Sequence, residues 1–146
     1  TRMKYSTPLA NDFTMAATAL ADVTGASVAV DANKTYGIEV IGSWSTNNTA
    51  GQVNVTLSLP SGATIDAIRN VAIANGNLSN IGILASDGGT LATAIGTANT
   101  RCPLRITGIV KTGGTSGNIQ IRCASGSASH TAKVYAGIVI RRWEIL

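Results

Sequence analysis

The sequence predicts an all-β protein, and three observations lead to this prediction. Charged residues make up only 12% of the chain and aromatic residues only 4%, whereas 45% of residues are hydrophobic. Strands favour Thr, Val and Ile, but surface helices need the Glu, Lys and Arg that this chain uses sparingly. Short alternating runs recur between clusters of turn residues. A chain of 146 residues with this pattern fits an antiparallel two-sheet sandwich that is jelly-roll-like.

An extended N-terminal arm is expected over residues 1–12, followed by a single β-sandwich domain over residues 13–146. The arm contains Arg2, Lys4 and Tyr5 but no hydrophobic periodicity, so it either frays or is held by another surface. It also lacks the apolar stretch of a secretory signal. No segment approaches the roughly 20 apolar residues that span a bilayer, and we therefore expect no membrane partner.

Eight to nine short strands are expected along the domain, and no helix. The segment IDAIRNVAIAN has partly helical spacing, but its β-branched residues favour a strand. A small-residue loop with one weak strand is expected within residues 86–100. Apart from this weak strand, the predicted strands are residues 13–21, 27–31, 35–44, 52–60, 65–75, 80–86, 101–111, 117–125 and a final strand that ends near residue 140.

Two of these strands have the clearest alternation. QVNVTLSLP alternates strictly and points its residues from Val53 to Leu59 inward at every second position. TYGIEVIGSW places alternate residues from Tyr36 to Trp44 on one face, where Gly42 leaves a gap typical of a bulge or of close packing. Both strands are therefore expected to face the core.

The two cysteines, Cys102 and Cys123, are interpreted as free thiols. RCPLRITGIVK and GNIQIRCAS are expected to form a hairpin that turns at TGGTSG, which places Cys123 opposite about Ile106. The resulting offset from Cys102 exceeds the distance that a disulfide tolerates. Free, half-buried thiols are typical of a protein made in a reducing cytoplasm.

The sequence offers little to catalysis, and we expect the protein not to be an enzyme and to bind no cofactor or metal. Its single histidine, His130, lies in a predicted turn, and one histidine with two distant cysteines makes a poor zinc site. The acidic residues are scattered, and no G-x-S-x-G motif occurs. The net charge of +4 comes from residues spread along the chain, so we expect no nucleic-acid partner. A mildly basic surface suits an acidic protein partner.

The chain ends with AKVYAGIVIRRWEIL, in which a buried strand is expected to reach about Ile140 before RRWEIL emerges from it. An exposed apolar ending would promote aggregation. It is therefore expected to be covered, either by the domain's own edge or by a neighbouring subunit or another protein. Arg141, Arg142 and Trp143 would then flank an interface, because Arg and Trp are frequent contact anchors.

Three stretches resemble a family of known proteins. ATALADVTGASVAVDANKTYGIEVIGSW has an A-T-A-L strand, a small-residue link and an alternating strand headed by Thr-Tyr, and a loop rich in Ser, Gly and Ala follows late in the chain. The ending SGSASHTAKVYAGIVIRRWEIL is similar to a V-x-A-G-S-x-L close, with Ile138 where such endings often carry Ser or Thr. From about Phe13 to Leu146 the chain resembles the small β-sandwich virion proteins of tailed bacteriophages.

The resemblance implies a structural role on a virion, as a capsid decoration (cement) protein or in a head fibre. Such a protein would be made in the host cytoplasm and would bind the major capsid protein or neighbouring virion proteins, often as a homo-oligomer (dimer or trimer). Its contact surface would comprise the two termini, with Arg2, Lys4, Tyr5, Arg141, Arg142 and Trp143, together with one edge. The alternative is a receptor- or glycan-binding fibre or tail domain with an exposed aromatic cluster in a loop groove.

Overall fold

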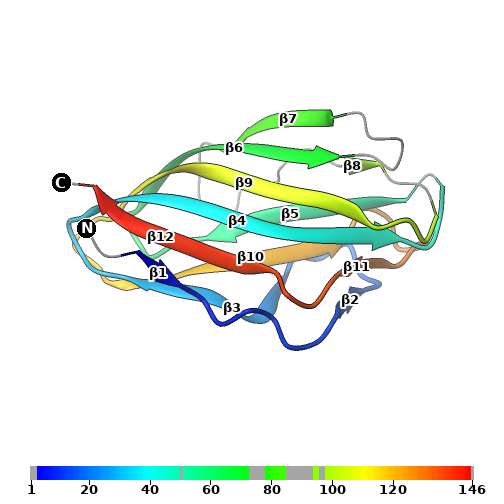
Figure 1. Ribbon diagram of the computed structural model, residues 1–146, viewed down its shortest axis with the longest axis horizontal. Coiled ribbons are helices and arrows are strands. Elements are labelled where there is room, and N and C mark those ends of the chain that lie inside the picture. The colour runs from blue at the N-terminus through cyan, green and yellow to red at the C-terminus, as the bar shows by residue number, and fades with distance from the viewer. Residues whose placement is uncertain (1–2, 50, 73–77, 85–93, 96–97, 146) are drawn as a thin grey trace.

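The protein is a sandwich of two antiparallel β-sheets in a computed structural model (Figure 1). The structure describes residues 3–49, 51–72, 78–84, 94–95 and 98–145, with side chains described outside residues 67–97. No helix occurs in these residues, and the expected all-β sandwich is confirmed. In particular, no helix long and apolar enough to cross a membrane is found among them.

The larger sheet contains eight strands of the described chain. Its main path runs β1-β12-β4-β9-β6-β7, and β11 joins β4 to the short strand β2. The strands are β1 (Lys4–Tyr5), β2 (Phe13–Met15), β4 (Thr35–Thr46), β6 (Thr64–Ala72), β7 (Leu78–Leu84), β9 (Cys102–Lys111), β11 (Ala132–Val134) and β12 (Val139–Ile145).

The smaller sheet has four strands in the order β3-β10-β5-β8. They are β3 (Ala21–Val30), β5 (Gln52–Ser58), β8 (Ala94–Ile95) and β10 (Gly117–Ser125).

The order of the strands is that of a jelly roll. β1 with β2, and β11 with β12, can each be taken as one interrupted strand. The larger sheet then contains the first, last, third and sixth strands of the roll, and the smaller sheet the second, seventh, fourth and fifth. The hairpin of β6 and β7 is an addition that extends the larger sheet beyond β9. The jelly-roll expectation is therefore confirmed.

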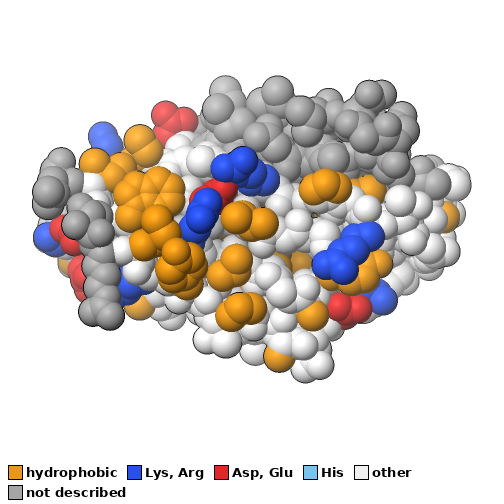
Figure 2. Space-filling model, viewed as in Figure 1, with side chains coloured by type: hydrophobic (Ala, Val, Ile, Leu, Met, Phe, Trp, Pro, Cys, Tyr) orange, Lys and Arg blue, Asp and Glu red, His pale blue; other side chains and the backbone are white. Residues whose placement is uncertain are grey.

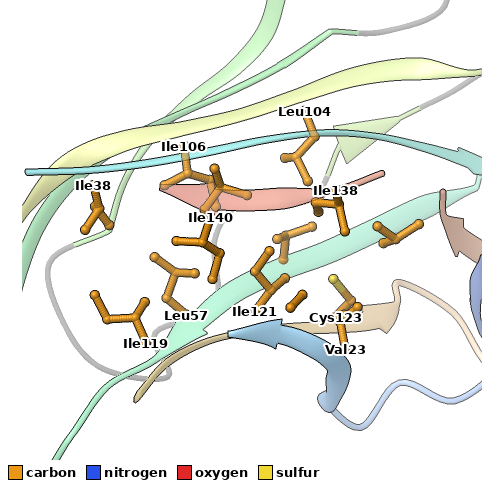
Figure 3. Close-up of a cluster of buried hydrophobic side chains, with 14 of the residues drawn as sticks. Val23, Ile38, Leu57, Leu104, Ile106, Ile119, Ile121, Cys123, Ile138 and Ile140 are labelled. Atoms are coloured by element: carbon orange, nitrogen blue, oxygen red, sulfur yellow. The ribbon is translucent and has the colours of Figure 1, made fainter. Parts of the chain in front are cut away.

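The core lies between the sheets and follows the alternation of the sequence (Figure 3). β5 buries its residues from Val53 to Leu57 at every second position, and Leu59 beyond it is also buried, as expected. β4 buries Trp44 and Tyr36 completely on the same side. The gap at Gly42 is a site of close packing, because a Cβ there would lie 2.6 Å from Cγ1 of Ile138.

The expected hairpin of β9 and β10 is wrong. β9 pairs with β4 and β6 in the larger sheet, whereas β10 pairs with β3 and β5 in the smaller one. The connection between them crosses from sheet to sheet and is held by the β3–β4 connection, since the Thr112 hydroxyl donates to the Asp31 carbonyl at 2.7 Å. Both strands alternate, and alternation shows only which side chains face the core. Cys102 and Cys123 are free, but they are fully buried rather than half-buried.

Two other strand predictions need correction. Residues 16–20, part of the first predicted strand, are not in a strand and include bends at 17–19, because the chain passes there from β2 in the larger sheet to β3 in the smaller one. The last strand does not release RRWEIL after Ile140, since β12 continues to Ile145 and pairs with β4 along its length. A turn at Gly137, with φ of +89°, separates β12 from β11.

Residues 3–12 lie along β12 and the turn that precedes it. The Ser6 amide donates to the Ile140 carbonyl at 2.7 Å, and the Gly137 amide donates to the Leu9 carbonyl at the same distance. Asp12 accepts a hydrogen bond from the Ala136 amide at 2.9 Å. The arm is thus held by the same domain, and both terminal segments lie side by side (Figure 1).

Candidate interaction surface

The residues proposed from the two termini lie close together, apart from Arg2, which lies outside the described residues. Lys4 is the register partner of Arg142, and Tyr5 is the partner of Arg141. Both β1 residues are exposed, and Tyr5 keeps 60% of its surface accessible. The pairing of β1 with β12 therefore brings together residues that are more than a hundred positions apart, with Tyr5 and Arg141 on one side of the sheet and Lys4 and Arg142 on the other.

Trp143 lies over its own sheet. Its register partner in β4 is Gly37, and a Cβ on Gly37 would come 2.1 Å from Cε2 of the indole and 2.4 Å from its Nε1. The ring therefore packs against the backbone at Gly37, a place that only glycine leaves free. Trp143 is half-buried in this position. The domain's own face covers one part of the tryptophan and leaves the rest accessible.

Arg142 points the other way, into the sandwich. It is 3% exposed, and its guanidinium carbon lies 4.4 Å from the centroid of the Tyr36 ring, a cation–π contact. The Tyr36 hydroxyl in turn donates to Asp31 at 3.3 Å. Arg142 follows the inward residues Ile138 and Ile140 at every second position, so its side chain contributes to the end of the core and not to the outer surface.

Glu39 is the central polar residue of the outer face, and the sequence analysis did not single it out. Its carboxylate is 3% exposed on a face that otherwise meets solvent. Arg105 in β9 contacts it at 2.5 Å, and Arg141 in β12 binds the same carboxylate. The two arginines remain partly exposed, at 58% and 33%. The cluster thus has one buried negative charge beneath two accessible positive charges.

Apolar side chains surround this cluster. Strand alternation and register place Ile41 on the side of β4 that carries Glu39, Ile109 on the matching side of β9, and Ile145 and Trp143 on that of β12. Ile41, Ile109 and Ile145 are 42%, 43% and 40% exposed. We call these residues with Tyr5, Glu39, Arg105 and Arg141 the outer patch. Figure 2 shows apolar groups gathered around a basic and acidic cluster on this side.

The outer patch accounts for nearly all of the exposed large apolar residues in the described chain. These residues are Met3, Tyr5, Ile41, Ile109 and Ile145. Met3 accepts a hydrogen bond from the Tyr5 hydroxyl at its sulfur, so it lies beside the patch. Apolar side chains scattered singly are ordinary on a protein surface, whereas a gathered set indicates a contact region.

A second cluster lies at the other end of the same face. The Tyr135 ring has the Arg101 guanidinium 4.4 Å and the Lys133 ammonium 5.5 Å from its centroid. Lys133 also forms an ion pair with Asp12 at 3.6 Å. Beside the ring is a hollow of about 290 Å³ with hydroxyl and amide groups in its wall, from Ser45, Asn47, Asn99 and Thr131 among others.

Among the described residues, no group of three or more His, Cys, Asp or Glu side chains is placed to hold a metal ion. His130 lies in the loop after β10, as its predicted turn implies, and its side chain is half-buried there. Burial raises the pKa of the Cys123 thiol to about 12 and also raises that of Cys102, so both thiols stay protonated near neutral pH.

No protein-family model matches the chain, and no curated protein matches it in sequence. Several solved structures resemble it distantly. One is the tripod from the baseplate of bacteriophage Tuc2009, with a TM-score of 0.38 and 14% identity over 86% of this chain and 63% of that one. Another comprises the CBM22-1–GH10 modules of Clostridium thermocellum endo-1,4-beta-D-xylanase 10B with xylohexaose. Its TM-score is 0.34, with 14% identity over 76% of this chain and 17% of that one.

A third likeness is to infectious bursal disease virus, Gx strain, with a TM-score of 0.28 and 14% identity over 97% of this chain and 39% of that one. The chain therefore spans less than two thirds of each of these three proteins. All three TM-scores lie below 0.5, and we base no functional argument on them.

Proposed function

We propose that the protein is a structural component of a phage virion that binds the outer surface of the capsid through its outer patch. The observation that carries this proposal is the gathering of exposed apolar residues around Glu39, Arg105 and Arg141 on one sheet face. An interface typically combines such an apolar centre with arginine and aromatic anchors. The resemblance of the sequence to small phage virion proteins supplies the class of partner.

Charge supports the choice of an acidic shell protein as the partner. The chain has a net charge of +4, and the two arginines of the outer patch outnumber its one carboxylate. Complementary charge steers two proteins together and fixes their register. In this proposal the protein has no catalytic role, and it stabilises contacts between capsid subunits.

The test uses emptied capsids of the phage to which the proposal assigns this chain. Saturating protein should bind them and raise their thermal transition, measured by scanning calorimetry. Ile109→Glu should weaken binding by more than about tenfold, because it removes an apolar contact and adds a negative charge. Asn118→Glu is the matched control, since Asn118 is exposed on a central strand of the smaller sheet. An unchanged transition with saturating protein, or equal losses from both variants, would contradict the proposal.

The hollow beside Tyr135 favours a second candidate function, the binding of a glycan. Hydroxyl and amide groups next to an aromatic ring are the groups that bind sugars, and this hollow lies at a loop end of the sandwich. A glycan array should then return binders that Tyr135→Ala abolishes. An array without binders would exclude this candidate and leave the capsid proposal unaffected.

A further inference from the structure

The edges of the two sheets differ in how well they are protected against pairing with another strand. β1, at one edge of the larger sheet, has two residues, includes Lys4 and is followed by Pro8. β8, at one edge of the smaller sheet, also has two residues. Short strands, lysine and proline are the usual protection of a sheet edge. β3 is ten residues long and pairs only with β10 among the described strands.

The first half of β3 is protected by a bulge. The pairing with β10 shifts between Gln120 and Arg122, whose partners are Ser27 and Asp22. The side-chain nitrogen Nε2 of Gln120 donates to the backbone carbonyls of Val23 at 2.8 Å and Ala26 at 3.0 Å. A bulge bends the strand and makes its edge a poor partner for a further strand.

The second half of β3, Ser27–Val30, has none of these protections. These four residues pair one by one with Gly117 to Gln120 and include no charged residue and no proline. Ala29 is exposed. Within the described chain, no other strand or loop forms a backbone hydrogen bond to the outer side of Ser27, Val28 or Ala29. Within the described chain, this stretch is therefore a regularly paired, neutral strand edge whose outward backbone groups have no backbone partner.

A hollow of about 600 Å³ runs beside the same stretch. One wall is formed by Met3 to Thr7 of the arm and the other by Ser27 to Ala29 of β3. β1 and β3 lie on the same side of the molecule in Figure 1. Met3 and Tyr5, which are 42% and 60% exposed, border the hollow and offer apolar area next to the free edge.

We propose that residues 27–30 pair with the same stretch of a second copy of this chain, antiparallel and about a two-fold axis that passes between Ala29 and Ala29 of the second copy. Ala29 then lies opposite itself and Val28 lies opposite Val30, and because none of these residues is charged, no like charges meet. The backbone pairs of four residues bury less than the ~1,000 Å² of a stable interface, and the arm residues at the hollow supply further area. The two smaller sheets would become one. The paired edge of β3 contains no residue of the outer patch, although Tyr5 belongs to that patch and also borders the hollow, and the inference goes beyond capsid binding.

The test is the mass of the isolated protein in solution, measured by sedimentation equilibrium. The wild type should be a dimer at about 50 µM, with a dissociation constant in the micromolar range. Ala29→Lys should raise that constant by at least about tenfold, because two lysines would meet at the paired edge. Asn118→Lys is the control, since Asn118 is the register partner of Ala29 one strand further in, and it should remain a dimer.

A second measurement needs no substitution. Amide hydrogen exchange within residues 27–30 should slow as protein concentration rises, at the alternate residues whose N–H groups face away from β10, because the dimer protects these groups. A wild type that is monomeric at about 100 µM, or a dimer that Ala29→Lys and Asn118→Lys affect equally, would overturn the inference. A monomer whose Ala29→Lys variant binds capsids less well would overturn it too and would assign the edge to a shell segment. Capsid binding that is sensitive to Ile109→Glu alone would leave the proposed function standing.

Discussion

The outer faces of the two sheets differ although they cover the same core. The face of the smaller sheet presents short polar side chains, such as Asn54, Ser58 and Asn118, and none of the exposed large apolar residues of the described chain. The face of the larger sheet carries the outer patch. A sandwich needs only its inner faces to be apolar. The apolar residues outside the larger sheet are therefore unnecessary for folding, and this difference points to a contact surface.

The same contrast holds for ion pairs. On the larger sheet, Glu39 is 3% exposed between two arginines. On the smaller sheet, Asp22 is 64% exposed and pairs with Arg122 at 3.0 Å between Oδ1 and Nε. A buried carboxylate loses more of its hydration than an exposed one and depends more on its partners. The pair on the larger sheet is thus part of the structure, whereas the other is an ordinary surface pair.

The largest expected effect separates these two ion pairs. Glu39→Gln should lower the free energy of unfolding by about 2–3 kcal/mol, because it leaves two arginines against a neutral amide, although both can still reach water. Asp22→Asn should cost no more than about 0.5 kcal/mol. Guanidinium denaturation of both variants measures the difference. Equal costs would show that Glu39 is no more important than a surface residue.

A somewhat smaller effect is expected under Trp143. Gly37→Ala places a methyl group where the indole now lies, so the ring must lift away, at a cost of about 1–3 kcal/mol. The tryptophan emission should also shift to longer wavelength, while the fully buried Trp44 gives a constant background. Gly114→Ala is the control, because no atom lies within 4 Å of a Cβ at that position. An unchanged emission spectrum in Gly37→Ala would show that Trp143 does not rest on Gly37.

The sequence predicted which side chains face the core but not which strands are neighbours. The inward positions of β4 and β5 follow from alternation alone, because a strand with one buried face must alternate. The false hairpin of β9 and β10 has the same cause, since both strands alternate in whichever sheet they lie. Pairing depends on the path of the turns, and the cross-sheet connection at Thr112 is fixed by a contact with Asp31 distant in sequence.

The candidate surface was predictable only in part, for the same reason. Tyr5, Arg141 and Trp143 were proposed from their types and their place near the termini. Glu39 could not be found in this way, because its importance follows from the pairing of β4 with β12, which places it opposite Arg141. Arg142 looked equivalent to its neighbour in the sequence. Only the observed register shows that it shares the inward side of the strand with Ile140.

The smallest expected effect concerns the inner faces, where the two sheets should not differ. Cys102 in the larger sheet and Cys123 in the smaller one are both buried, so iodoacetamide should label neither thiol in the native protein at pH 8.

The pKa of Cys123 is raised from 9.0 to about 12, so the folded state keeps a proton that the unfolded state loses. Stability is therefore complete below pH 9 and decreases from pH 9 towards pH 12, by about 1.4 kcal/mol at pH 10. Cys123→Ala should remove this part of the decrease, whereas Cys102→Ala should leave most of it in place. Urea denaturation at pH 8 and pH 10 measures the free energy of unfolding of both variants. A decrease that persists unchanged in Cys123→Ala would show that the thiol is not protonated by burial.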